Sequence, residues 1–203
     1  FADVLAERTR HLSVLVEELY QPHNTNAVLR SCECFGIQDV HVIENVNEFD
    51  ISTSISMGSH KWLDIETHAN SKSAIEKLKK KGYTIVATCL TDDAIPPEDY
   101  DISKPTVLMF GSEKSGLSQE AIDQADVKMK IPILGFTESF NVSVSAAILL
   151  HYFSSKMRSA ESITWGLNEA EKDELQMAWV EKHLKAPEQL KEYYYEQIVN
   201  QKA

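Results

Sequence analysis

The chain has few arginines and no long hydrophobic run, and each shortage argues against a class of protein. Only four of the 203 residues are arginine, and the formal net charge is −11. This balance argues against a general nucleic-acid coat, because phosphate binding depends on Lys and Arg. A local basic patch remains compatible with RNA binding. No apolar run approaches the roughly 20 residues that a transmembrane helix needs, so we expect no membrane span.

Cysteines are also scarce, which bears on the compartment. The three cysteines, Cys32, Cys34 and Cys89, are odd in number and follow no disulfide pattern, so a reducing cytoplasm is predicted. Cys32 and Cys34 lie two residues apart in a helical pattern and point in different directions, which does not favour a metal site. No secretory signal is visible. Because the chain starts at Phe1 and not at Met, we expect further residues to precede it.

Several catalytic motifs are missing. The seven histidines show neither H-x-x-x-H nor H-E-x-x-H spacing, so zinc catalysis is not predicted and no metal is expected. No G-x-S-x-G turn is found, which argues against a serine hydrolase. Neither a Walker loop nor the G-x-G-x-x-G fingerprint is present. A nucleotide-dependent dehydrogenase is therefore only a weak alternative.

What the chain does have is an alternation of buried strands and amphipathic helices. This alternation predicts an α/β fold with a mainly parallel sheet flanked by helices. Strands are expected over residues 13–19, 40–43, 83–90, 106–110 and 127–131. Helices are expected over residues 1–11, 24–35, 73–81, from 118 onward, and 141–157. In the second of these helices we expect Asn24 to be the N-cap and Gly36 to mark the end.

The pattern changes after about residue 159. Residues 168–183 and 187–200 predict two amphipathic helices with no strand between them. We therefore expect a domain over residues 1–159, including a short N-terminal helix, and a helical C-terminal extension over 160–203. The extension carries more acidic than basic residues, which favours packing or dimerisation over nucleic-acid binding.

Three segments are candidates for carrying chemistry. Residues 131–145 pass from a strand through a Pro-x-x-Gly loop into a polar helix start, where backbone groups can hold a small polar ligand. Residues 110–117 form a loop between a strand and a helix, and the glycines near its two ends let the backbone approach a ligand closely. The simpler alternative is a turn followed by a helix cap. Arg30 lies among apolar residues and is placed to hold a phosphate with its planar fork, although a solvated helix charge is the simpler alternative.

Together, residues 22–36, 110–118 and 131–143 resemble the three motifs of the SpoU family of RNA ribose methyltransferases, in the SPOUT class. The order and separation of the motifs match, and the resemblance covers about residues 10–158. Within the family the chain is most similar to the TrmH type, which methylates the 2′-hydroxyl of guanosine 18 in the tRNA D-loop. The Pro-His-Asn opening, residues 56–62 and 86–88, and the helical tail support that similarity.

The resemblance implies a fold, a cofactor and partners. It implies a sheet closed by a deep C-terminal trefoil knot, a rare exception to ordinary chain connections. The second and third motifs are then the knotted loops, and they bind S-adenosylmethionine in a bent form. It also implies a homodimer whose active site is completed at the interface, with tRNA as the substrate.

The resemblance also implies roles for single residues. Arg30 matches the catalytic arginine, which we expect to bind the RNA phosphate and to lower the pKa of the ribose hydroxyl. The other expected catalytic residues are Asn24, Glu113, Ser139 and Asn141. The expected cofactor-binding residues are Thr88, Gly111, Ile131 and Phe140. Phe140 stands where the family usually has Leu. The candidate RNA contacts are Arg8, Arg10, His11, Lys61, Lys114 and Arg158.

Alternative functions stay open at this point. The motifs indicate the reaction more firmly than the substrate, so 2′-O-methylation at the tRNA wobble ribose or in ribosomal RNA is one alternative. Another is a non-catalytic RNA-binding or donor-binding protein of the same fold. The presence of Arg30, Asn24, Glu113 and Asn141 favours an enzyme, because a scaffold has no need of them.

Overall fold

The computed structural model describes residues 1–17, 22–43 and 58–183. These residues form two compact units. One comprises residues 7–166, and the other joins residues 1–6 to the chain from Leu167 onward. The division expected from the sequence, a domain over residues 1–159 that includes the N-terminal helix and an extension over 160–203, stays a prediction. The expected helix over 187–200 lies outside the described residues, as does part of the 56–62 segment.

A six-stranded sheet with the strand order β3-β2-β1-β5-β4-β6 forms the centre of the unit 7–166. Every neighbouring pair of strands is parallel. β1 and β5 lie in the middle, and all their residues are buried, as expected for strands covered on both faces. The strands are β1 (Leu12–Glu17), β2 (Asp39–Ile43), β3 (Asp64–His68), β4 (Thr84–Thr88), β5 (Thr106–Phe110) and β6 (Val127–Met129).

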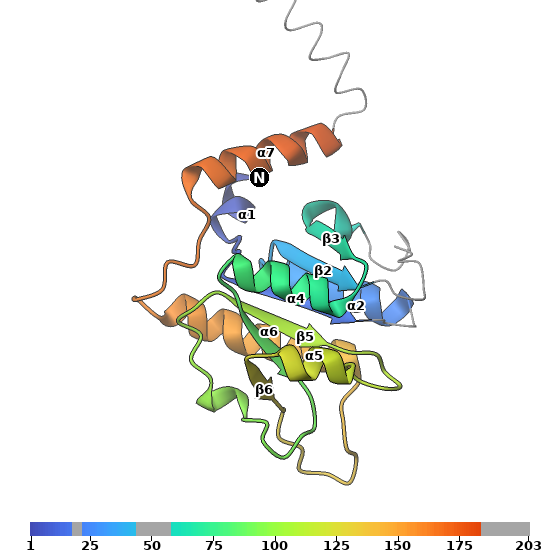
Figure 1. Ribbon diagram of the computed structural model, residues 1–203. Coiled ribbons are helices and arrows are strands. Elements are labelled where there is room, and N and C mark those ends of the chain that lie inside the picture. The colour runs from blue at the N-terminus through green and yellow to red at the C-terminus, as the bar shows by residue number, and fades with distance from the viewer. Residues whose placement is uncertain (18–21, 44–57, 184–203) are drawn as a thin grey trace, which may run out of the picture. The chain divides into compact units, whose positions relative to one another are not determined.

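Helices cover both faces of this sheet (Figure 1). α2 (Pro22–Cys34) and α6 (Val142–Ser159) pack against each other on one face, and α4 (Ser71–Lys80) and α5 (Gln119–Gln124) cover the other. Two short 3-10 helices, η1 (Ser59–Trp62) and η2 (Pro97–Asp99), lie in the connections. The two faces therefore have separate apolar cores.

The second unit contains α1 (Ala2–Ala6) and α7 (Glu169–His183). The Phe1 ring packs edge-on against Trp179, with 5.8 Å between the ring centroids. Trp179 is buried, so it anchors α7 by apolar contact. In the part of the chain that the structure describes, no helix has the length and apolarity to cross a membrane.

Most predicted elements are confirmed, with shifts at their ends. Strand 106–110 and helix 168–183 are found almost as predicted, and Gly36, with φ of 74°, follows the end of α2. The N-terminal helix ends at Ala6 and not at residue 11. β3 was not predicted, because its sequence Asp-Ile-Glu-Thr-His has no apolar run and lies at the sheet edge.

The expectation that Asn24 is an N-cap is wrong. α2 begins at Pro22, which suits the first turn of a helix because proline has no amide hydrogen to leave unbonded. Asn24 therefore lies inside the helix, and its side chain is buried. This placement makes the Asn24 amide available for contacts with other elements.

A polar cluster lies at the β3 edge of the sheet, on the face covered by α4. His41 of β2 lies 3.1 Å from His68 of β3, measured from Nδ1 to Nε2. Glu66 of β3 pairs in register with His41, and its carboxylate is approached by Lys77 of α4 and by Lys81, which follows α4. Burial, followed by the charge of His68, lowers the pKa of His41 from 6.5 to about 4, although Glu66 opposes this.

The depressed pKa of His41 makes the stability of the fold depend on pH. In the unfolded chain His41 takes up a proton near pH 6.5, whereas in the fold it resists protonation down to about pH 4. The contribution of neutral His41 to the stability of the fold is therefore fully present above pH 6.5, and it is lost as the pH falls from 6.5 to about 4. Burial lowers the pKa of His68 as well, so His68 acts in the same direction.

We expect the free energy of unfolding to fall by about 3 kcal/mol between pH 6.5 and pH 4 on account of His41. Urea unfolding at several pH values, with a chelator present, measures this change. His41→Gln should flatten the profile in that window. A wild-type profile as flat as that of the variant would contradict the assigned role.

Candidate functional site

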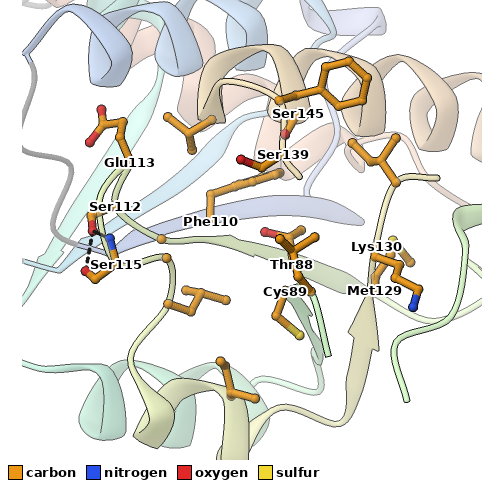
Figure 2. Close-up of a pocket in the computed structure, with 18 of the residues that line it drawn as sticks. Thr88, Cys89, Phe110, Ser112, Glu113, Ser115, Met129, Lys130, Ser139 and Ser145 are labelled. Atoms are coloured by element: carbon orange, nitrogen blue, oxygen red, sulfur yellow. Dashed lines mark hydrogen bonds between the residues drawn. The ribbon is translucent and has the colours of Figure 1, made fainter. Parts of the chain in front are cut away.

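A cavity of about 400 Å³ opens at the carboxyl ends of β4, β5 and β6. Such a place on a parallel sheet is where α/β proteins usually bind ligands, and the volume suits a small molecule. Figure 2 shows Ser112, Glu113 and Ser115 at one end of the cavity and Met129 and Lys130 at the other. All four expected cofactor-binding residues line it, as do three more of the predicted site residues: Thr88, Gly111, Ile131, Phe140, Glu113, Lys114 and Ser139.

The loop after β5 turns back on itself, and Gly111 is essential to that turn. The Ser112 amide donates to the Gly116 carbonyl at 3.1 Å, and the Gly116 amide donates to the Ser112 carbonyl at 2.9 Å. A Cβ on Gly111 would lie 2.0 Å from the Gly116 carbonyl carbon and 2.1 Å from the Leu117 nitrogen. Since these are backbone atoms, only glycine fits here without a shift of the loop.

The loop after β6 offers backbone groups to a ligand. Residues 131–140 form no helix or strand, and in the described part of the chain none of them bonds to another backbone group. Their amides and carbonyls require partners from solvent or from a bound molecule. Ile131, Ile133 and Phe140 supply apolar side chains to the same cavity. This combination suits a ligand with both a flat apolar part and polar edges.

Thr88, the last residue of β4, and Cys89, which follows it, also line the cavity. The Thr88 hydroxyl donates to the Met109 carbonyl of β5 at 2.7 Å, and this bond fixes the end of β4 beside β5. The Cys89 amide donates to the Met129 carbonyl at 3.0 Å and so continues the pairing toward β6. Three strand ends are thereby held in a fixed arrangement around the cavity.

A chain of amide hydrogen bonds links the three sequence motifs. Asn24 Nδ2 of α2 donates to Glu113 Oε1 at 2.5 Å, and Asn141 Nδ2 donates to Asn24 Oδ1 at 3.2 Å. Asn141 is also the N-cap of α6, because its Oδ1 accepts from the Ser143 amide at 2.9 Å. The structure thus brings together Asn24, Glu113 and Asn141, which lie far apart in the sequence.

Sequence reasoning missed one residue that shapes the site. Glu17, at the carboxyl end of β1, is buried and accepts hydrogen bonds from the Ser118 amide at 2.6 Å and the Ser118 hydroxyl at 2.7 Å. It also accepts from the Ser71 hydroxyl of α4. Ser118 caps α5 directly after the glycine loop, so Glu17 holds that loop in place. The signal that could have identified Glu17 is a charged residue at the end of an apolar strand, which is visible in the sequence.

The expected catalytic residue Arg30 has a different setting. It is exposed on α2 and is not among the residues that line the cavity. Ser139 is exposed as well but does line the cavity. Glu113 and Ser139 therefore line the cavity, whereas Asn24, Asn141 and Arg30 do not. Asn24 and Asn141 are linked to the cavity through hydrogen bonds that lead to Glu113.

The expected RNA contacts fall into two groups. Arg8 is only 1% exposed, and its guanidinium pairs with Glu33 and donates to the Ile37 carbonyl. The expectation that Arg8 contacts RNA is therefore wrong, because its side chain is buried inside the protein. Arg10 pairs with Asp39 and Asp64.

Arg158 and His11 are also engaged within the protein. Arg158 pairs with Glu7 and stacks 4.2 Å from the Trp165 ring centroid, and the His11 ring contacts the Ile102 carbonyl at 2.7 Å. Lys61 and Lys114 are exposed, and Lys114 lies at the cavity. An RNA contact at Lys61 and Lys114 stays a prediction.

The fold and its cavity are those of an α/β protein with a ligand-sized cleft at the carboxyl ends of a parallel sheet. The model of the SpoU rRNA Methylase family matches residues 11–151. The chain belongs to this family.

Several similar proteins are named as tRNA-modifying enzymes. A tRNA (guanosine(18)-2′-O)-methyltransferase of Borreliella burgdorferi is 39% identical over 176 residues, which cover 87% of this chain and 80% of the relative. The enzyme of that name from Thermus thermophilus is 40% identical over 148 residues, or 73% of this chain and 76% of the relative. The crystal structure of the A. aeolicus TrmH/SpoU tRNA modifying enzyme matches with a TM-score of 0.82 and 31% identity, covering 90% of this chain and 94% of that one.

Proposed function

We propose that this protein is an S-adenosylmethionine-dependent methyltransferase that modifies the 2′-hydroxyl of guanosine 18 in tRNA. The observation that carries the proposal is the Asn141–Asn24–Glu113 chain of hydrogen bonds, which joins the three motif segments beside a cavity that Glu113 lines. The relatives named for this activity, at 39% and 40% identity, support the choice of substrate.

The cavity fits the expected cofactor on grounds of shape and chemistry. Backbone groups of residues 131–140 have no backbone partner in the described chain and suit the polar edge of an adenine or ribose. Ile131 and Phe140 offer apolar surface for the ring, and Phe140 replaces the usual Leu without closing the cavity. When bound, S-adenosylmethionine supplies an activated methyl group on a sulfonium centre.

The side chains of this protein supply position and charge. Arg30 binds the phosphate next to the target ribose and stabilises negative charge on the 2′-oxygen as its proton leaves. Asn24, Glu113 and Asn141 orient the polar end of the site through their hydrogen-bond chain, and Ser139 adds a hydroxyl at the cavity. Lys61 and Lys114 contact the RNA backbone.

A second copy of the chain completes the site in this proposal. Arg30 lies outside the cavity wall, which supports a contribution from across an interface. Large apolar side chains are exposed on the loop after β6 and on α6, and such a patch suits burial against another copy: Leu134, Phe136, Phe140, Val144 and Ile148. In the same proposal the loops of residues 110–117 and 131–140, which line one cavity, are the two loops of a trefoil knot.

The test is methyl transfer from labelled S-adenosylmethionine to unmodified tRNA transcripts, with mapping of the modified nucleotide. A 2′-O-methyl group at guanosine 18 is expected. The matched control is the same tRNA with 2′-deoxyguanosine at that position, which lacks the nucleophile and should accept no methyl group. Methylation at another nucleotide would overturn the substrate. Tight donor binding without transfer to any RNA would overturn the enzymatic role.

Asn141 has two separable roles, which two substitutions can distinguish. Asn141→Ala removes both the N-cap of α6 and the bond to Asn24, so we expect a loss of about 1 kcal/mol in unfolding free energy together with a loss of activity. Asn141→Ser restores a capping oxygen but not the amide donor, so stability should return while activity stays low. Urea unfolding and methyl-transfer rates measure the two effects. Full activity in Asn141→Ser would show that the link to Asn24 is dispensable.

A further inference from the structure

The polar cluster at the β3 edge combines side chains that can bind a ligand, and it lies apart from the cavity proposed for methyl transfer. His41, Glu66 and His68 belong to β2 and β3, whereas the cavity is formed by β4, β5, β6 and the segments that follow them. β1 separates β2 from β5 in the sheet order. Whatever this cluster binds therefore does not depend on the proposed methyl transfer.

The three side chains converge because of the sheet register. His41 and Glu66 are paired residues on neighbouring parallel strands, so they lie beside each other. His68 follows Glu66 by two residues and so points to the same face of the sheet. That face carries α4, and the side chains of His41 and His68 are only 4% and 6% exposed. Two imidazoles and a carboxylate are thus gathered in a largely enclosed place.

The separations between the ligand atoms suit one small cation. His41 Nδ1 lies 3.1 Å from His68 Nε2. Oxygens of Glu66 lie 3.7 Å from His41 Nδ1 and 4.0 Å from His68 Nε2. Four ligands held at 2.0–2.1 Å in a tetrahedron around zinc lie about 3.3 Å apart, so only small side-chain movements separate this cluster from a coordination shell.

We propose that His41, Glu66 and His68 bind a divalent transition metal ion, with Zn²⁺ the best match. Two imidazoles and one carboxylate form a donor set that zinc accepts, and solvent reaches the cluster through Glu66, whose side chain is 34% exposed. A water molecule takes the fourth position. The ion ties edge strand β3 to β2 from the side that α4 covers.

Lys77 and Lys81 compete with the metal for Glu66. Lys77 Nζ hydrogen-bonds the carboxylate, and Lys81 Nζ lies 3.7 Å from it. Both lysine side chains are half exposed, so they can turn into solvent when a cation arrives. Their charges weaken metal binding, and removing one of them should strengthen it. An increase in metal affinity on removal of a lysine distinguishes the proposed site from chance binding of the metal at surface histidines.

The experiment is calorimetric titration of Zn²⁺ into the full chain after chelator treatment, with thermal unfolding measured alongside. One ion per chain and a rise in the unfolding temperature are expected. His68→Gln should weaken binding at least about 10-fold, and Lys77→Ala should tighten it several-fold. The controls are His151→Gln, an exposed histidine on α6, and Cys34→Ser, an exposed thiol, neither of which should change the affinity.

Three outcomes would overturn the proposal. They are the absence of saturable Zn²⁺ binding, binding that is lost in Cys34→Ser, and an affinity that is the same in wild type, His68→Gln and Lys77→Ala. If His68→Gln fails to fold, Lys77→Ala decides alone, because the Lys77 side chain is half exposed and its removal should leave the fold intact. Methyl transfer is not a readout here, so failure of the proposed enzymatic activity would leave this test unaffected.

Discussion

Gly111→Ala is expected to weaken S-adenosylmethionine binding by at least about 100-fold, which is a loss of roughly 3 kcal/mol. The new methyl group would lie 2.0 Å from the Gly116 carbonyl carbon and 2.3 Å from its oxygen. These backbone atoms cannot rotate away as a side chain does, so the whole loop of residues 111–117 must move. Because this loop forms one side of the cavity, its movement changes the shape of the binding site.

Calorimetric titration with S-adenosylmethionine measures this effect. Gly166→Ala is the matched control, since a Cβ at Gly166 meets nothing within 4 Å and its φ is not positive. Circular dichroism should show that the sheet survives in both variants. Donor affinity within about threefold of wild type in Gly111→Ala would contradict the assigned role of the loop.

Arg30→Ala is expected to lower the turnover number by about 100-fold to 1,000-fold, the usual cost of removing a group that stabilises transition-state charge. Donor affinity should stay nearly unchanged, because Arg30 does not line the cavity. Arg30→Lys keeps the positive charge but loses the planar fork that holds a phosphate at two points, so it should also be impaired, by at least about 10-fold.

Single-turnover methyl transfer on tRNA, combined with donor titration, separates these two effects. Lys80→Ala is the control, because Lys80 is an exposed cation on α4 on the other face of the sheet. Retention of most turnover in Arg30→Lys would show that charge alone suffices. A parallel loss of donor affinity in Arg30→Ala would instead indicate that Arg30 acts through the cavity.

The sequence is a good guide wherever a local pattern decides the structure. β5 was predictable because five consecutive apolar or β-branched residues form a buried strand, and the end of α2 because only Gly36 readily adopts a φ of 74°. Residues of the second and third motifs line one cavity, as is expected where parallel strands end at the same edge of the sheet, and their roles there stay predictions. In these cases short-range chemistry and the fold agree.

The sequence is a poor guide wherever a long-range contact decides. Nothing near Arg8 in the sequence indicates that Glu33 and the Ile37 carbonyl bury its guanidinium. The convergence of His41 with His68 depends on strand register, which a one-residue slip would reverse. The histidine spacings that exclude familiar zinc motifs therefore do not bear on a cluster built across two strands.

The strand order has a consequence for how the protein is made. Among the strands of the sheet, β1 is synthesised first and can pair with β2 soon afterwards. Its other partner is β5, so the pairing of Leu12 with Thr106 forms only after the intervening residues have been synthesised. Pairing between segments so far apart folds slowly. Until β5 is synthesised, one side of the buried strand β1 is an open edge, which promotes aggregation of nascent chains. The wild-type protein should therefore benefit from chaperones, and truncation before Thr106 should yield insoluble fragments.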